Sequence, residues 1–281
     1  MKKIIILILC FSFLSCTKKS MQTGRGKTIT IKGSDTMVIL GQRWAEYYMK
    51  LNPDIIVQVT GGGSGTGIAA LINAATDICQ ASRPMTDEEK KLIFKKYNKN
   101  VEEIPVALDG IAVYVNEKNP VKTLSLIQLR KIYKGEIDNW YEFGWDKKEI
   151  VVYGRENNSG TYMYFKEHVL EGEDFVNTVQ ALPGTAAIVN AVSKDKYSIG
   201  YGGMAYAKGV KEILIKKDET SIPQKPSIEN IVSGKYPLSR KLFFYTVDKP
   251  QGVIKKFIDW VLSPDGQKIC DEVGYCSISL K

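Results

Sequence analysis

The chain has 281 residues, 44% of them hydrophobic, and a formal net charge of +8. Its basic residues are scattered and form no stripe interleaved with aromatic residues, so nucleic-acid binding is not expected. The single histidine and the five cysteines fall at spacings that match no zinc site, so neither a metal ion nor another cofactor is expected.

The N-terminal segment has the pattern of a targeting sequence. Two lysines precede an apolar run over residues 4–14, which is too short to remain as a membrane-spanning helix. Small residues and Cys16 follow, an order typical of a bacterial lipoprotein. We expect a signal peptide over residues 1–15, lipidation of Cys16 and a polar tether over residues 16–27, with the folded part held outside the cytoplasm. The alternative is an ordinary secretory signal in which Cys16 remains a thiol.

Strands and helices alternate in the N-terminal part of the chain. The β-branched stretches KTITI (27–31) and IIVQV (55–59) predict strands. Between them, apolar residues recur at helical spacing and predict a helix that ends before the Asn-Pro pair at 52–53. The expected core face of this helix consists of Met37, Leu40, Trp44, Tyr47, Tyr48 and Leu51.

The same alternation continues toward the C-terminus. Strands are predicted over residues 110–116, 149–154, 198–203 and 213–217. Helices are predicted over residues 125–133, 162–170 and 251–263. Because strands and helices alternate through short polar turns, we expect an α/β fold with mixed, largely parallel sheets. No stretch has the composition of a disordered linker, so two lobes joined by chain crossings are expected.

The glycine-rich loop VTGGGSGTGI (59–68) follows a predicted strand and opens a helix. It fails the P-loop pattern of nucleotide-binding proteins, because Ile68 stands where a lysine is required. It also fails the pattern of a serine-hydrolase nucleophile, because Thr66 replaces the glycine two residues after Ser64. The one candidate base, His168, lies in a predicted helix and is expected to face solvent. No enzyme is therefore expected. The remaining interpretation is that the loop opens a helix whose N-terminus offers N–H groups and hydroxyls to an anion.

Four polar loops of this kind follow predicted strands. In open α/β sheets, ligands bind at the carboxyl ends of the strands, so we expect the four loops to converge on one oxyanion. For each serine or threonine the alternative is an N-cap that satisfies only its own helix. Thr86, with Glu89 three residues later, predicts a capping box directly after the loop that contains Ser82 and Arg83. The candidate binding residues are Ser34, Asp35, Thr36, Ser64, Ser82, Arg83, Arg155, Ser159, Gly160 and Thr161.

Six motifs resemble those of the PstS-type phosphate-binding proteins, the extracytoplasmic receptors of ABC phosphate importers. They are KGSDTM, GGGSGTGI, ASRPM, YGRENNSGT, IGYGG and YPLSRKLFFY, and the resemblance runs from about Thr28 to near the C-terminus. It implies a two-lobe fold like that of type II periplasmic binding proteins, which closes around a dehydrated phosphate. The first lobe is expected over residues 28–107 and 208–281, and the second over 108–207. The implied partners are inorganic phosphate, an ABC permease in the cytoplasmic membrane and, through the anchor, the membrane itself; a monomer is expected.

The resemblance also implies roles for the loop residues. Ser34 and Thr36 would offer N–H and hydroxyl donors from the first loop, and Ser64 would do so from the second. Ser82 corresponds to the small polar residue of its loop. The other lobe would contribute Arg155, Ser159, Gly160 and Thr161.

One position departs from the family pattern. Some members have an aspartate directly after the position of Ser82, where it accepts the proton of the phosphate and excludes sulfate, but this chain has Arg83. A site built around a ligand hydroxyl can reject an analogue that lacks it by on the order of 10⁴. Asp35 and Asp109 are the two candidates for the missing acceptor. Asp35 could instead pair with Arg83 or cap its helix, and Asp109 could be a turn residue.

Two other functions stay open on the sequence. The ligand could be another tetrahedral oxyanion such as sulfate, molybdate or tungstate, or the chain could be a lipid-anchored surface protein that does not serve transport. Cys270 and Cys276 could form a disulfide or remain as buried thiols.

Overall fold

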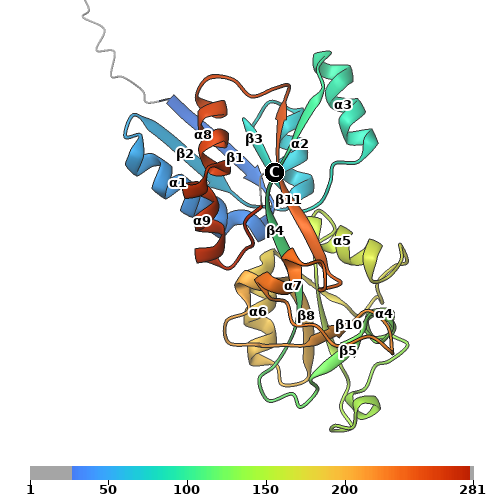
Figure 1. Cartoon of the computed structure of the whole chain (residues 1–281). Coiled ribbons are helices and arrows are strands. Elements are labelled where there is room, and N and C mark those ends of the chain that lie inside the picture. The colour runs from blue at the N-terminus through green and yellow to red at the C-terminus, as the bar shows by residue number, and fades with distance from the viewer. Residues whose placement is uncertain (1–26, 279–281) are drawn as a thin grey trace, which may run out of the picture.

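The computed structural model describes residues 27–278, which form two lobes, one above the other in Figure 1. The strands are β1 (Lys27–Gly33), β2 (Ile55–Thr60), β3 (Ile78–Ala81), β4 (Val101–Val115), β5 (Thr123–Ser125), β6 (Val151–Arg155), β7 (Gln180–Leu182), β8 (Ser198–Gly203), β9 (Lys211–Glu212), β10 (Leu214–Lys216) and β11 (Ser239–Val247). The helices are α1 (Val38–Leu51), α2 (Ser64–Ile72), α3 (Asp87–Tyr97), α4 (Leu126–Tyr133), α5 (Gly160–His168), α6 (Gly184–Lys194), α7 (Ile228–Val232), α8 (Gly252–Leu262) and α9 (Pro264–Val273). Single turns of 3-10 helix lie at η1 (Asp35–Met37), η2 (Trp140–Phe143) and η3 (Met204–Tyr206).

One sheet runs through both lobes in the order β2-β1-β3-β11-β4-β8-β6-β7, and β9 pairs with β4 beside it. β1 pairs in parallel with β2 and β3, and β6 pairs in parallel with β7 and β8. β4 and β11 run antiparallel to their neighbours. The predicted α/β fold with two lobes and mixed sheets is confirmed.

Helices cover both faces of the sheet in the first lobe. On one face, Trp44 of α1, Phe257 of α8 and Ile269 of α9 share a core with β1, β3 and β11. On the other face, Ile68 of α2 and Ile93 of α3 pack against β3 and β11. The predicted core face of α1 is partly wrong. Two of its six members, Tyr47 and Leu51, are 37% and 64% exposed, because they lie beyond the edge of the apolar face.

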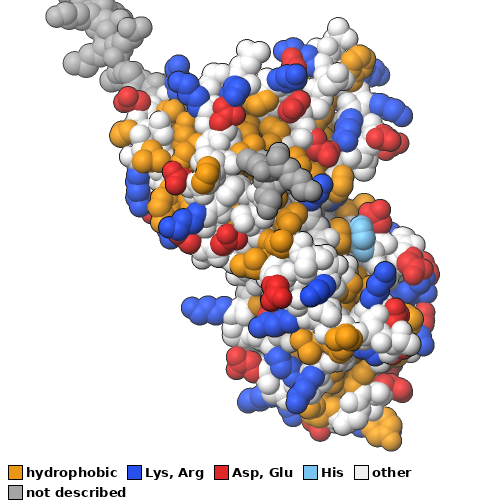
Figure 2. Space-filling view, viewed as in Figure 1, with side chains coloured by type: hydrophobic (Ala, Val, Ile, Leu, Met, Phe, Trp, Pro, Cys, Tyr) orange, Lys and Arg blue, Asp and Glu red, His pale blue; other side chains and the backbone are white. Residues whose placement is uncertain are grey.

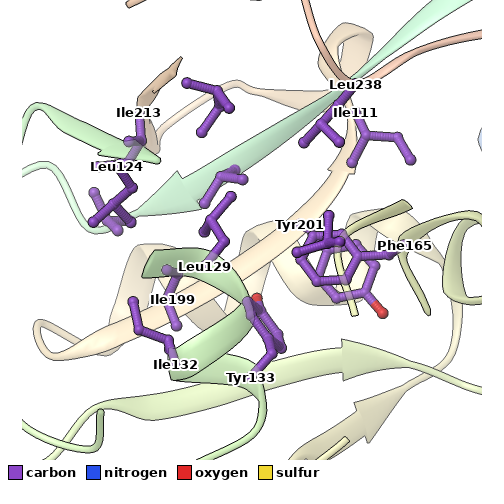
Figure 3. Packing of buried hydrophobic residues seen from close by; sticks show 14 of the residues in the cluster. Ile111, Leu124, Leu129, Ile132, Tyr133, Phe165, Ile199, Tyr201, Ile213 and Leu238 are labelled. Carbon is purple, nitrogen blue, oxygen red and sulfur yellow. The ribbon is translucent and has the colours of Figure 1, made fainter. Parts of the chain in front are cut away.

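The second lobe has a core of its own, shown in Figure 3. Aromatic rings hold its centre, where Phe165 of α5 stacks on Tyr201 of β8 at a centroid distance of 3.9 Å and Tyr133 of α4 packs edge-on against both. On the opposite face of the sheet, Ile188 and Val192 of α6 are buried with residues of β4. This packing fixes the direction of α5, whose first residues belong to the RENNSGT motif.

The return crossing lies later in the chain than the sequence suggests. Residues 208–238 were expected in the first lobe, yet their buried apolar side chains lie in the core of the second, as Figure 3 shows for Ile213 and Leu238. Short strands and a short helix in this segment carry too little apolar periodicity to indicate which core they join. We therefore propose that the second lobe extends from about residue 110 to about residue 238.

The two lobes are linked by β4 and β11, the long strands at the narrow waist in Figure 1. They pair antiparallel from Val247↔Val101 to Ser239↔Gly110, and β4 then continues into the second lobe beside β8. Within this ladder Arg240 lies directly opposite Asp109. Directly opposed residues have side chains on the same face of a sheet, so the register brings these two charges together between the lobes.

Other expectations fall partly outside the structure. The signal peptide, Cys16 and the tether up to residue 26 lie outside the described residues, and within those residues no helix is long and apolar enough to cross a membrane. The cysteines of the described part, Cys79, Cys270 and Cys276, are buried free thiols, so no bridge joins Cys270 to Cys276. The helix α9 was not predicted from the sequence, and Ser263 separates it from α8 by capping its first turn.

We predict that Gly67→Ala destabilises the first lobe. A Cβ at this position of α2 would lie 2.5 Å from the Cα of Gly33 and 2.5 Å from the carbonyl oxygen of Lys32, and neither backbone atom can move alone. Overpacking of this kind costs about 1–3 kcal/mol of unfolding free energy, measurable by urea denaturation. Gly65→Ala in the same helix is the matched control, because the nearest atom to its Cβ, the carbonyl oxygen of Asn158, would lie 3.3 Å away. Equal losses from both substitutions would contradict the close approach of α2 to β1.

Candidate functional site

Three strand ends of the first lobe bring serine hydroxyls together. Ser34 follows β1, Ser82 follows β3, and Ser64 opens α2 after the loop that follows β2. Ser34 Oγ donates to Ser82 Oγ at 2.9 Å, and Ser64 Oγ accepts from the backbone N–H of Ser82 at 3.1 Å. All three residues are buried. The predicted convergence of these loops is therefore present in the fold.

The second lobe meets this cluster with the N-terminus of α5. Thr161 Oγ1 lies 2.9 Å from Thr36 Oγ1, so the two hydroxyls hydrogen-bond across the lobes. The Cα of Gly160 packs onto the serine cluster so closely that an added Cβ would lie 2.4 Å from Ser64 Oγ and 2.6 Å from Ser82 Oγ. Hydroxyls from both lobes thus surround one buried point at a helix N-terminus, where the positive end of the helix dipole favours an anion.

The N-cap alternative holds for only one of the serines. Ser159 Oγ accepts from the backbone N–H groups of Thr161 and Tyr162 and so caps α5. Ser34 makes no side-chain capping bond, and Ser64 is the first residue of α2 rather than its cap. The hydroxyls of Ser34 and Ser64 are therefore directed into the cluster. Because the oxygen of Ser159 accepts twice, its own O–H is still available to donate.

Arg155 joins the two lobes through Asp35. Its Nη2 donates to Asp35 Oδ2 at 2.8 Å, and its Nη1 donates to Thr185 Oγ1 at 3.0 Å. The guanidinium is buried, and burial lowers the pKa of Arg155 while the charge of Asp35 opposes that shift. Asp35 Oδ1 accepts from the backbone N–H of Gly62, so both oxygens of this carboxylate are engaged.

Arg83 does not enter the cluster. Both of its terminal nitrogens donate to the carboxylate of Glu89, at 2.8 and 2.7 Å. Glu89 also accepts from the backbone N–H of Thr86, whose hydroxyl accepts from the N–H of Glu89, and the predicted capping box of α3 is confirmed. Arg83 therefore stabilises the start of α3 through Glu89. Asp35 pairs with Arg155 and not with Arg83.

Asp109 and Arg240 form a buried ion pair, and Arg240 contacts the cluster. Asp109 is inside β4 rather than in a turn, fully buried, and its Oδ2 accepts from Nε and Nη2 of Arg240 at 3.0 and 2.8 Å. Among the described residues, its Oδ1 has no hydrogen-bond partner, although it is buried. Burial raises the pKa of Asp109 and the charge of Arg240 opposes the rise.

Arg240 contacts the cluster, although the sequence did not indicate it as a candidate binding residue. It lies in the motif YPLSRKLFFY, but nothing in the local sequence separates it from the neighbouring Lys241. The structure shows Arg240 buried and Lys241 exposed. Both basic residues precede an apolar run, and a charge is rarely buried without a partner, so the choice between them depended on the position of Asp109.

A groove borders the cluster between the lobes. It has a volume of about 480 Å³ and lies between the loop after β3, helix α5 and β11, with Ser82, Tyr164 and Arg240 in its wall. His168 also lines it and stacks on Tyr164 at a centroid distance of 3.8 Å. His168 is exposed, as expected, and its Nδ1 is hydrogen-bonded to the carbonyl oxygen of Tyr164.

Charged side chains of both signs are mixed on the surface. Lys and Arg side chains alternate with Asp and Glu over the face seen in Figure 2, without a large patch of one sign. In the part of the chain from residue 27 to residue 278, no group of His, Cys, Asp and Glu side chains is placed to hold a metal ion.

We predict that Gly160→Ala weakens anion binding more than it weakens the fold. The new methyl group would occupy the space beside Ser64 Oγ and Ser82 Oγ and push α5 away from them. A displacement of this size costs about 1–3 kcal/mol, or roughly 5- to 150-fold in the dissociation constant. Calorimetric titration with phosphate measures the loss, and an unchanged constant would show that α5 does not close on the ligand.

The chain matches known proteins over most of its length. The family model described as a PBP superfamily domain matches residues 19–265. The "Phosphate-binding protein PstS" of Pseudomonas aeruginosa is 33% identical over 276 residues, which cover 92% of this chain and 85% of that protein. The protein of the same name from Staphylococcus haemolyticus is 35% identical over 254 residues, covering 87% and 79% of the two chains.

Solved structures agree in fold. A putative phosphate ABC transporter substrate-binding protein from Clostridium perfringens, solved with bound phosphate, has a TM-score of 0.82 and 29% identity, covering 90% of this chain and all of that one. An ABC-type phosphate transport receptor from Vibrio cholerae has a TM-score of 0.71 and 30% identity, covering 89% and 100%. The chain therefore belongs to the PBP superfamily and, within it, to the family of PstS phosphate-binding proteins.

Proposed function

We propose that this protein is the phosphate-binding receptor of an ABC importer, which captures inorganic phosphate between its lobes and delivers it to the permease. The observation that carries this function is the convergence of buried hydroxyls from both lobes on the N-terminus of α5, beside two buried arginines. Membership of the PstS family supports the same ligand and the same transport role. The family consists of substrate-binding receptors, so the protein is not an enzyme.

A phosphate stripped of water must regain its hydrogen bonds from the protein. We assign the donors to the hydroxyl and N–H groups of the converging loops and to Arg155. Closure of the second lobe supplies Thr161, Gly160 and Arg155, which the first lobe lacks, so ligand binding favours the closed arrangement. The assigned donors are Ser34, Thr36, Ser64, Ser82, Arg155, Ser159, Gly160 and Thr161.

We assign the acceptor of the phosphate proton to Asp109 rather than to Asp35. Both oxygens of Asp35 are engaged, one by Arg155 and one by Gly62. Asp109 Oδ1 is buried and has no partner among the described residues. A buried acceptor without a donor is costly, and a protonated ligand oxygen would relieve that cost. Sulfate has no proton to offer and would meet this oxygen with repulsion.

Titration calorimetry of the purified chain with phosphate, sulfate, molybdate and tungstate tests this function. Tight binding of phosphate alone is the expected result. Binding of another oxyanion in place of phosphate would mean that the protein is a receptor for that anion. If none of the four anions binds, the alternative of a surface protein without a transport role is favoured.

We also propose an extracytoplasmic location with a lipid anchor at Cys16. The lipoprotein pattern of residues 1–16 supports it, as does the transport role of the family. Both lobes of the proposed site come from one chain, so a monomer suffices for binding. Mass spectrometry of the protein from membranes should find a diacylglyceryl group on residue 16.

A further inference from the structure

Arg240 contacts residues from both lobes with one guanidinium. Its Nη2 donates to Thr36 Oγ1 at 3.3 Å in the first lobe and to Thr161 Oγ1 at 3.1 Å in the second. Its Nη1 donates to the carbonyl oxygen of Ser82 at 3.1 Å. Only 6% of the residue is exposed, and the ring of Tyr164 lies against the guanidinium at 5.7 Å. The orientation of Arg240 is therefore fixed from several sides.

The same guanidinium hydrogen-bonds to one of the two carboxylate oxygens of Asp109 and not to the other. Nε and Nη2 both donate to Oδ2, and Oδ1 is left without a partner among the described residues. A carboxylate accepts at both oxygens only while it is ionised; once protonated, it becomes a donor as well. Arg240 is the one residue in the described part of the chain that forms an ion pair with Asp109.

The other titratable groups near Asp109 do not supply a charge. They come from β4, α5, η3, the loop before β11 and the segment after α9, and burial raises the pKa of each of them, which keeps them neutral. These groups are Tyr114, Tyr164, Tyr206, Tyr236, Tyr275 and Cys276. Without Arg240, only the nearby backbone N–H groups of Gly110 and Met204 would oppose burial, which raises the pKa of Asp109 and favours its protonated form.

Arg240 also sets the direction of the threonine hydroxyls. A hydroxyl oxygen that accepts from a guanidinium must point its own proton elsewhere. Thr36 and Thr161 both accept from Arg240 and hydrogen-bond to each other, so one proton lies between them and the other is free to be donated to a ligand. Arg240 thereby makes the threonines donors, while it leaves Asp109 Oδ1 as an acceptor.

We propose that Arg240 is a specificity-determining positioning residue, which selects a protonated oxyanion by holding Asp109 as an acceptor and the threonines as donors. This inference rests on the proposed phosphate-binding function. Arg240 acts by orienting Asp109, Thr36 and Thr161, and its guanidinium need not contact the phosphate.

The test compares two substitutions by calorimetric titration with phosphate and sulfate. In Arg240→Gln the charge is lost, Asp109 takes up a proton, and the preference for phosphate over sulfate should fall from on the order of 10⁴ to within about tenfold. In Arg240→Lys the charge stays but the fork that orients the threonines is lost. Phosphate affinity should then fall about 10- to 100-fold, while most of the preference remains. Lys241→Gln, the exposed neighbour on β11, is the control and should leave both quantities unchanged.

Two outcomes separate the inference from the function on which it rests. If the unaltered protein binds no phosphate, the proposed function fails first. If it binds phosphate and rejects sulfate, but Arg240→Gln keeps the same preference, Arg240 has only a structural role. The ratio of two dissociation constants does not depend on the folded fraction, so partial unfolding of a variant does not obscure the result. As a further check, Asp109→Asn combined with Arg240→Gln should lose no more of the preference than either substitution alone.

Discussion

Replacing Asp109 by asparagine is expected to abolish the discrimination between phosphate and sulfate. The amide presents an N–H group where the carboxylate presents an acceptor, and it leaves the buried guanidinium of Arg240 without its counter-charge. The proton of the phosphate loses a charged acceptor, and loss of a buried hydrogen bond to a charge on binding costs about 2–5 kcal/mol, so phosphate affinity should fall roughly 30- to 5000-fold. Sulfate affinity should fall less or rise.

Asp35→Asn is the matched control for this carboxylate. Both oxygens of Asp35 are engaged by protein groups, so its replacement should weaken binding of both anions in similar proportion and leave their ratio intact. Calorimetric titration with each anion measures the two constants. If Asp35→Asn removes the discrimination and Asp109→Asn keeps it, the assignment of the two carboxylates must be exchanged.

Arg155→Ala is expected to remove most of the affinity for phosphate. Arg155 belongs to the second lobe and reaches Asp35 of the first, so the substitution removes both a cationic donor and a contact that holds the lobes together. The expected loss is again about 2–5 kcal/mol in binding free energy. Removal of the arginine also leaves Asp35 unpaired, which adds repulsion toward any anion.

Arg83→Ala provides the comparison for that experiment. The guanidinium of Arg83 is bound to Glu89 outside the cluster, so its loss should lower the stability of α3 and leave phosphate affinity near that of the unaltered protein. Thermal unfolding and phosphate titration measure the two effects separately. Near-native affinity in Arg155→Ala, or a large loss in Arg83→Ala, would contradict the proposed site.

The loop residues could be predicted because their positions follow from the order of strands and helices. A serine directly after a parallel strand lies at the carboxyl edge of the sheet whatever the details of packing, and this held for Ser34 and Ser82. The capping box at Thr86 and Glu89 was predictable for the same reason, since it depends only on local spacing.

The ionic partners could not be predicted, because they depend on distant parts of the chain. The pairing of Asp109 with Arg240 arises from the antiparallel register of β4 and β11, which are separated by most of the second lobe. Arg83 is the exception, because its partner Glu89 is only six residues away, but the position of Arg83 after a strand fitted a ligand contact equally well. The choice between Asp35 and Asp109 likewise required knowledge of which oxygens already have partners.

A crystal structure of the phosphate complex at high resolution tests the central claim most directly. The account predicts that phosphate lies among the hydroxyls of Ser34, Ser64 and Thr161, with one of its oxygens at a short distance of about 2.5–2.7 Å from Asp109 Oδ1, as for a hydroxyl bonded to a carboxylate. A phosphate bound elsewhere, or bound here with only donors around it and no contact to Asp109, would contradict the account.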